Sequence, residues 1–330
     1  MSDASSLIPV FIPTLANMLA FAEQTKGAPL TAAEVEAVRD NSTCIMMEST
    51  DAQKLAQSRD YIDVNPENCW ADWHRLRVQM TGKGYLPKMI LCIPGGDDLR
   101  ARCGPILEQE KVEHEFRPHD KNMLQAFKAS STTWPAFTAE DFARIDGHTT
   151  MLYLLSENFV AGAAPSVAKA FLSLGRRLLE AGGIAIKCES SGISHSIARW
   201  SRLDDSANRS PDDKWSALFH AYVAYPIGGN TEFYTCGMHL LGVPDLIVSR
   251  SIIETSVAVG ASPASATIEL FRIFGLYLVS ECPVGKFVSG HTFSIDRDAP
   301  RYRIVWEPCT GFADDSFFFN PFGRWRFTSV

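Results

Sequence analysis

The sequence predicts an α+β protein built from two domains, residues 1–148 and 149–330. Its 330 residues exceed the usual size of a single domain. Short apolar runs typical of strands alternate with segments of helical spacing, which favours sheets covered by helices. Hydrophobic residues make up 46% of the chain and charged residues 21%, as in ordinary globular proteins. We therefore expect two α/β sandwich-like domains, joined in the turn-rich stretch that begins at Ser131.

The first half predicts short helices and strands preceded by an arm. Two prolines interrupt the apolar residues between Leu7 and Phe21, which indicates a partly ordered arm packed on the body. Thr31 and Glu34 have the spacing of a capping box, so a helix is expected to begin there. Three strands are predicted: a short buried strand at residues 44–49, a second strand at residues 88–94 and, from its alternation, an exposed strand at residues 112–119.

The most regular prediction is a strand–helix–strand unit at the start of the second domain. A nearly continuous apolar run at residues 151–159 predicts the first strand. Pro165 suits the first turn of a helix, and Gly182 is placed to end it. Alternation from Ile184 then predicts the second strand. A crossover between parallel neighbours is the expected geometry, with ferredoxin-like pairing as the alternative.

The last third predicts an antiparallel sheet covered by two helices, within a second domain whose sheet as a whole is expected to be mixed. Strand-like runs at residues 219–227 and 234–249 flank Gly228 and Gly229, which is typical of a hairpin. Pro263 marks the start of a helix, and short strands separated by Gly, Asp and Pro follow it.

Charge and composition restrict the possible partners. The chain has 38 acidic and 31 basic residues and a net charge of -7, which gives no basic footprint for nucleic acid and disfavours anionic membranes. The first 25 residues have neither the basic start of a signal peptide nor an unbroken apolar span. The eight cysteines are scattered without a C-x-x-C pair. We expect a cytoplasmic protein with reduced thiols that binds neither nucleic acid nor membranes.

One polar turn could support catalysis. Ser190, Ser191 and Gly192 follow a predicted strand, and Ser194, His195 and Ser196 lead into a predicted helix. A hydrolase could use Ser191 as nucleophile, His195 as base and Glu189 as the group that orients the base. The G-x-S-x-G elbow is absent, because Glu189 stands where its first glycine would be. A turn whose hydroxyls bond their own backbone is the competing interpretation.

No motif predicts a metal ion or a cofactor. Gly95–Asp98 superficially resembles the signature of cyclic-dinucleotide synthases, but Leu99 and Arg100 after it favour the start of a helix. The sequence has no P-loop and no G-x-G-x-x-G. No metal-ligand spacing joins the histidines of the predicted second domain: His195, His220, His239 and His291.

Two acidic segments are candidates for binding a protein partner. Aromatic and acidic residues alternate around Trp70, a composition in which aromatic anchors supply binding energy and acids steer a basic partner. The candidates in this segment are Asp60, Tyr61, Asp63, Trp70 and Trp73. The second segment is a polar stretch, predicted to be a loop, with these candidates: Asp204, Asp205, Asp212 and Asp213.

Three segments in the second half resemble a known family. They are GGIAIKCESSGISHS, GMHLLGVPDLIV and KFVSGHTF, within residues 150–293. Together they are similar to an uncharacterised bacterial domain-of-unknown-function family. Some of its relatives are similar to proteins encoded beside secreted toxins, so the resemblance implies an immunity role. The family turn often carries an acidic residue before its glycine, where this chain has Ser289.

The sequence therefore predicts a non-catalytic cytoplasmic binding protein. The resemblance narrows this to an immunity protein that neutralises a bacterial toxin in interbacterial competition. A basic toxin such as a nuclease would complement the acidic chain. The alternative is a hydrolase that uses the Ser190–Ser196 turn.

Overall fold

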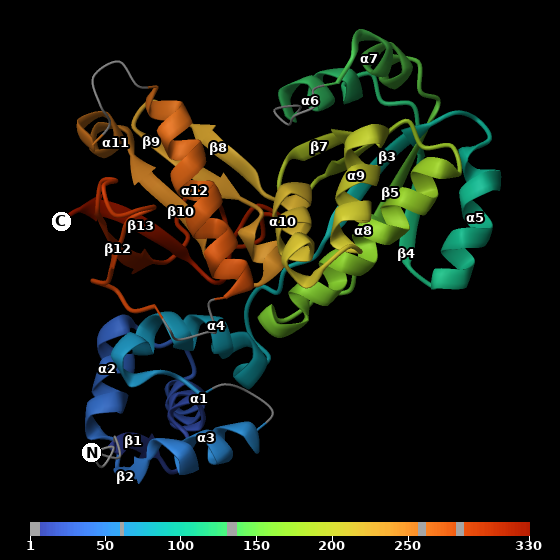
Figure 1. The fold of residues 1–330 in the computed structure, drawn as a ribbon. Helices are drawn as coiled ribbons and strands as arrows, with labels where there is room; N and C mark the ends of the chain where they lie inside the picture. The colour runs from blue at the N-terminus through green and yellow to red at the C-terminus, as the bar shows by residue number, and fades with distance from the viewer. Residues whose placement is uncertain (1–6, 60–62, 131–136, 257–261, 282–286) are drawn as a thin grey trace.

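The structure is a computed structural model that describes residues 7–59, 63–130, 137–256, 262–281 and 287–330. It has an α+β fold, as predicted, with a two-stranded, a five-stranded and a six-stranded sheet in the described residues. Figure 1 shows the three regions that these sheets define, which we name the N-terminal unit, the middle unit and the C-terminal sheet.

The N-terminal unit is a small helical cluster beside a two-stranded ribbon. Its elements are β1 (Leu7–Phe11), α1 (Leu15–Lys26), α2 (Ala32–Asn41), β2 (Cys44–Glu48), α3 (Ser49–Gln57), the 3₁₀ turn η1 (Pro66–Asn68) and α4 (Cys69–Thr81). The capping box of Thr31 and Glu34 is confirmed. The predicted arm is wrong, because its residues form β1 and α1. The strand at residues 44–49 is also not buried: β2 is largely exposed.

The middle unit contains the five-stranded sheet. Its elements are β3 (Ile90–Gly95), α5 (Leu99–Glu110), β4 (Glu113–Pro118), α6 (Met123–Ser130), α7 (Ala139–Asp146), β5 (Thr150–Leu155), η2 (Ala161–Ala163), α8 (Ala164–Glu180), β6 (Ala185–Cys188), β7 (Ile193–Ser196), α9 (Ile197–Ala207) and α10 (Pro211–Tyr222). The strand order is β4-β5-β3-β6-β7, and every adjacent pair is antiparallel.

This order is the ferredoxin-like arrangement of two interlocked strand–helix–strand units. The predicted unit β5–α8–β6 is present, but β3 lies between its two strands and pairs with both. The strands β5 and β6 are therefore parallel without being neighbours. The predicted crossover between adjacent parallel strands is wrong, and the alternative prediction of ferredoxin-like pairing is correct.

The predicted boundary after residue 148 divides this sheet. β3 and β4 lie before the boundary, yet they pair along their full length with β5, which lies after it. The division into domains 1–148 and 149–330 is therefore wrong. A turn-rich connection between strands cannot by itself show whether those strands share a sheet, because pairing is decided by contacts far apart in sequence.

The C-terminal sheet is mixed, so the antiparallel sheet predicted for the last third is wrong for one pair of strands. Its elements are β8 (Ala224–Gly228), β9 (Glu232–Cys236), η3 (Met238–Leu241), β10 (Asp245–Ser249), α11 (Arg250–Ser256), α12 (Pro263–Ser280), β11 (Thr292–Phe293), β12 (Tyr302–Glu307) and β13 (Arg324–Ser329). The order is β11-β12-β13-β10-β9-β8, with only β10 and β13 parallel among the described pairs.

The hairpin at Gly228 is confirmed, because Gly228 pairs with Phe233 across the turn from β8 to β9. The strands predicted on both sides of this turn were too long. Residues 219–222 end helix α10, and residues 234–249 contain η3 between β9 and β10.

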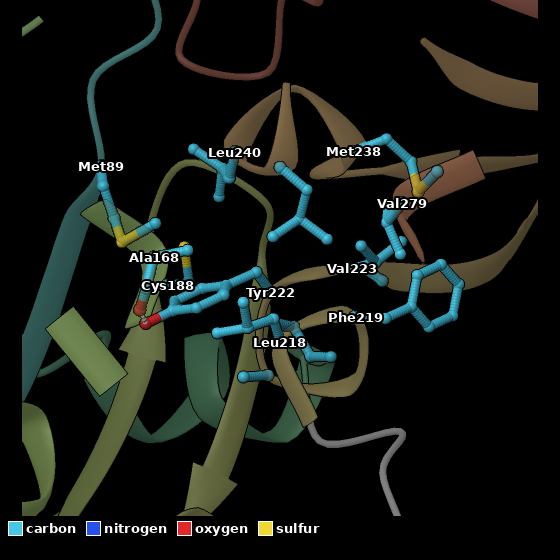
Figure 2. Close-up of a cluster of buried hydrophobic side chains, with 14 of the residues drawn as sticks. Met89, Ala168, Cys188, Leu218, Phe219, Tyr222, Val223, Met238, Leu240 and Val279 are labelled. Atoms are coloured by element: carbon cyan, nitrogen blue, oxygen red, sulfur yellow. Dashed lines mark hydrogen bonds between the residues drawn. The ribbon is translucent and has the colours of Figure 1, made fainter. Parts of the chain in front are cut away.

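One hydrophobic core joins the middle unit to the C-terminal sheet. Helix α10 lies between α9 on one side and α12 on the other, and buried side chains from both sheets form a single cluster around it (Figures 1 and 2). Tyr222 is fully buried, and its hydroxyl donates to the Ala168 carbonyl of α8 at 2.8 Å. Phe219 faces α12 at Gly275. The N-terminal unit instead has a separate core around Leu15, Val35 and Trp73.

Gly275 allows α12 to approach α10, so Gly275→Ala tests this contact. A Cβ at this position would lie 2.5 Å from Phe219 Cε2, inside a packed core. We expect overpacking to cost about 1–3 kcal/mol, offset by about 1 kcal/mol of helix propensity. The free energy of unfolding, measured with urea, should fall by up to about 2 kcal/mol.

Gly104→Ala in α5 is the matched control, because no atom lies within 4 Å of its added Cβ. We expect a change below about 1 kcal/mol. Equal effects of the two substitutions would contradict the proposed close approach.

Candidate functional site

The serine-rich segment forms a hairpin between two strands. Ser190, Ser191 and Gly192 make the turn from β6 to β7, and Gly192 has the left-handed backbone that such a turn requires (φ 73°). The predicted helix from Ser194 begins later, at Ile197, because residues 193–196 pair with β6.

Most hydroxyls of this segment bind the protein's own backbone or each other. The Ser190 hydroxyl donates to the Lys88 carbonyl at 2.7 Å and accepts from the Ile90 amide at 3.1 Å. Ser194 and Ser130 share a hydrogen bond of 2.9 Å. Ser196 caps α9 by accepting from the amide of its third residue. These contacts fix the hairpin to its neighbours, as the competing interpretation of the turn expected.

His195 is placed poorly for a catalytic base. It is fully buried, and its Nε2 donates to the Ala221 carbonyl at 3.0 Å. Burial lowers the pKa of its imidazole to about 3, whereas a base that works at neutral pH needs a pKa near 7. Side chains alternate along a strand, so Ser194 and Ser196 point to the face of β7 opposite His195.

The structure does not bring the three predicted catalytic residues together. Glu189 forms an ion pair with Lys187, and His195 bonds to Ala221. The Ser191 hydroxyl is buried beside the Cys188 thiol and has no hydrogen-bond partner among the described residues. No hydrogen bond between His195 and Ser191 or Glu189 is therefore found within the described part of the chain.

Ser191 lines a groove of about 420 Å³ between the middle unit and the C-terminal sheet. Aromatic and small apolar residues dominate its wall, with four hydroxyls and one thiol: Ser130, Ser191, Tyr225, Tyr234 and Cys236. Among its described lining residues there is no histidine, lysine or carboxylate. The groove thus offers Ser191 no general base.

Two serine substitutions distinguish a hydroxyl that stabilises the fold from one that does not. Ser190→Ala removes a hydroxyl that satisfies two buried backbone groups, so we expect it to lower the free energy of unfolding by about 1–3 kcal/mol. Ser191→Ala removes a hydroxyl without such a partner and should change it by less than about 0.5 kcal/mol. Urea unfolding measures both. A larger loss for Ser191→Ala than for Ser190→Ala would contradict these assignments.

Buried His195 should make the fold sensitive to acid. The unfolded chain takes up a proton on this residue below pH 6.5, while the folded imidazole resists protonation down to about pH 3. This contribution to stability is complete above pH 6.5 and is lost as the pH falls toward 3, by up to ~1.4 kcal/mol per pH unit.

The test compares the free energy of unfolding at pH 7 and pH 5 in wild type and in His195→Gln. We expect the wild type to lose more stability on acidification than the variant, because Gln does not titrate. His114→Gln, at an exposed position on β4, should retain the wild-type pH dependence. Equal losses for wild type and His195→Gln would refute this explanation.

Most of the described residues that were predicted to form a binding surface around Trp70 are buried, packed against other elements or cap a helix. Trp73 is fully buried in the core of the N-terminal unit. Trp70 is half-buried and packs edge-on against Trp306 of the C-terminal sheet. Asp63 accepts from the amides of Leu15 and Ala16 and so caps α1. Asp60 and Tyr61 lie outside the described residues. The prediction that Trp73 is an exposed contact for a partner is therefore wrong.

The second acidic segment is helical and partly buried. Asp204 on α9 is buried and bonds to Ser173 and Lys169 of α8. Asp205 is exposed and pairs with Arg176, and Asp212 and Asp213 lie in the first turn of α10. Acids there favour the helix through its dipole. The predicted loop is therefore wrong, and Asp204 is not available to a partner.

Exposed apolar residues gather instead on the N-terminal unit. Five of the eight large exposed hydrophobic residues in the described part of the chain belong to it: Leu7, Ile12, Phe21, Ile45 and Met46. Pro9 pairs with Met46 in the ribbon, so Leu7, Pro9 and Met46 lie on one face of the β1–β2 pair. We call this exposed face the ribbon face. The relative exposures of Leu7 and Met46 are 54% and 58%.

Sequence reasoning missed the ribbon face because residues 7–21 were predicted to form an arm and residues 44–49 a buried strand. Among the described residues, Leu7, Pro9 and Met46 stay exposed on one face of the two-stranded ribbon. The absence of polar alternation in both runs was the available signal.

Comparisons with known proteins add no relatives: no protein-family model, curated protein or solved structure matches this chain. In the described ranges, no three histidine, cysteine, aspartate or glutamate side chains gather closely enough to hold a metal ion. No helix in the described part of the chain has the length and apolar character needed to cross a membrane.

Proposed function

We propose that the protein is a non-catalytic binding protein whose N-terminal unit docks a basic protein partner. The observation that carries this proposal is the ribbon face, which exposes large apolar side chains. Exposed apolar residues in a group, bordered by polar ones, are typical of a surface that binds another macromolecule. Both edges of the two-stranded ribbon are also unpaired within the described residues, which would allow a partner strand to pair with it.

Charge supports a basic partner for this surface. Residues 7–81 contain ten acidic and six basic side chains. Among these acids, Glu36, Asp40, Glu48 and Asp51 are exposed. Glu48 lies opposite Leu7 on the ribbon face. An acidic side chain beside apolar anchors speeds the approach of a cationic protein and disfavours anionic ones.

The family resemblance narrows the proposal to an immunity protein. Its partner would be a toxin delivered between bacteria by a system such as type VI secretion, and a nuclease would have the required basic surface. We place the protein in the cytoplasm, where such a toxin would act. The alternative hydrolase draws no support from the Ser190–Ser196 hairpin, because His195 is fixed on a backbone carbonyl and the Ser191 groove lacks a base.

Co-production with the product of the gene directly upstream tests this function. We expect the full chain to restore growth of cells that produce that protein, and to bind it more slowly as salt is added. The double variant Leu7→Ala/Met46→Ala removes two apolar anchors and should weaken binding by at least about tenfold.

Ile268→Ala on α12 is the control, because Ile268 is comparably exposed (42%) but lies outside the N-terminal unit. It should protect as well as the wild type. Failure of the wild type to protect or bind would refute the immunity proposal. Equal binding by the double variant and the control would show that the ribbon face is not the docking surface.

A further inference from the structure

The groove of about 420 Å³ lies between the β6–β7 hairpin and one face of the β8–β9 pair. Tyr234 and Cys236 stand two positions apart on β9, so their side chains point to the same face. Their partners on β8, Ile227 and Ala224, share that face. All four residues line the groove and form its floor. The opposite face of β9 carries Phe233, which belongs to the core that the two larger sheets share.

Two phenylalanines from the connection between β12 and β13 form one wall of the groove. The rings of Phe312 and Phe318 pack together with 5.5 Å between their centroids. A Cβ at Gly192 would lie 3.7 Å from Phe318 Cε1, so the hairpin turn meets this wall. The turn also packs on the end of β9, because a Cβ at Gly237 would lie 2.6 Å from Ser191 Cβ. Three segments that are far apart in the sequence thus build the groove together.

Two of the four hydroxyls that line the groove have no hydrogen-bond partner among the described residues. The hydroxyls of Ser130 and Tyr225 bond to other side chains of the protein, at 2.9 and 3.2 Å. The Ser191 hydroxyl has no such bond, although the residue is only 2% exposed. The Tyr234 hydroxyl also makes none within the described part of the chain. A buried hydroxyl without a partner costs free energy, which a ligand that bonds to it would recover.

The described lining of the groove carries no charge. It includes two phenylalanine and two tyrosine rings but no lysine, arginine, histidine, aspartate or glutamate. An ion moved from water into such surroundings loses its hydration without gaining a counter-charge, so a charged ligand is disfavoured. A few polar groups among aromatic side chains, in a groove of this volume, are typical of a site for an uncharged organic molecule.

We propose that this groove binds a small uncharged aromatic molecule that carries a hydroxyl group. Its ring would lie against the Phe318 ring, in the offset or edge-on geometry that aromatic pairs prefer. Its hydroxyl would bond to the hydroxyls of Ser191 and Tyr234, each of which can donate and accept. No described lining residue is a general base, so the site binds this molecule without converting it. The inference is independent of the ribbon face and of the proposed protein partner.

Titration of the full chain with three probes that share one ring tests the chemistry of the site. The probe p-cresol has the hydroxyl, toluene lacks it, and p-toluate carries a charge in its place. We expect p-cresol to bind, and toluene to bind about fivefold more weakly because it lacks the hydrogen bond. The p-toluate anion should bind at least about tenfold more weakly than p-cresol, because its charge has no counter-charge in the groove. Ligand-observed NMR at pH 7 measures the three dissociation constants.

Two variants and a matched control locate the site. Ser191→Ala should weaken the binding of p-cresol about fivefold and leave that of toluene unchanged, because only p-cresol bonds to the hydroxyl. Phe318→Ala removes part of the wall and should weaken the binding of both probes by at least about tenfold. Phe317→Ala is the control, because Phe317 is the neighbour of Phe318 in the sequence, is 47% exposed and is not among the described lining residues. It should bind both probes as the wild type does.

The urea midpoint of each variant shows whether it is folded, so a loss of binding can be distinguished from unfolding. The proposal is overturned if the wild type binds neither p-cresol nor toluene, or if p-toluate binds as tightly as p-cresol. It is also overturned if folded Phe318→Ala binds as tightly as Phe317→Ala. If Phe318→Ala does not fold, Ser191→Ala decides, and equal binding of p-cresol by this variant and the wild type refutes the site.

Discussion

The packing of α10 between α9 and α12 is the constraint on which the rest of the structure depends. Buried residues of the two larger sheets form one shared cluster around this helix, in addition to a smaller cluster around Phe127 and Ile145 that belongs to the five-stranded sheet alone. Phe219 on one side of α10 contacts Gly275 of α12, while Tyr222 donates its hydroxyl to α8. A buried tyrosine needs a partner for its hydroxyl, so this hydrogen bond fixes the helix as well as filling space. The two sheets are consequently held in one orientation.

The polar residues between the sheets serve this packing. His195 donates to the Ala221 carbonyl near the end of α10. Gly237 has a left-handed backbone (φ 109°), and a Cβ there would lie 2.1 Å from the Tyr222 carbonyl oxygen. These contacts explain why a segment rich in serine and histidine can be structural: its groups satisfy buried backbone donors and acceptors at the junction. A group of catalytic residue types is therefore insufficient evidence of catalysis without a base that can reach the nucleophile.

One feature of the N-terminal unit concerns binding and has no internal explanation. The ribbon face leaves apolar surface in water, which costs free energy in the isolated chain. It lies in the separately cored N-terminal unit, so it can be tested without disturbing the core that the two larger sheets share.

The sequence by itself determined the local elements with strong signals: the capping box at Thr31, the strand–helix–strand unit from Thr150 to Cys188, and the hairpin at Gly228. These depend on residues close together in the chain, whose propensities act without tertiary contacts. The α+β class followed from the same elements. Sequence periodicity did not determine which strands pair, so the boundary at residue 148 was placed inside a sheet.

Only the tertiary structure decided the candidate sites. Trp73 and Asp204 have residue types common on binding surfaces, but packing buries them. Leu7 and Met46 have residue types common in cores, but a two-stranded ribbon leaves them exposed. Burial and charge proximity are properties of long-range contacts, and a single sequence read along its length does not contain them.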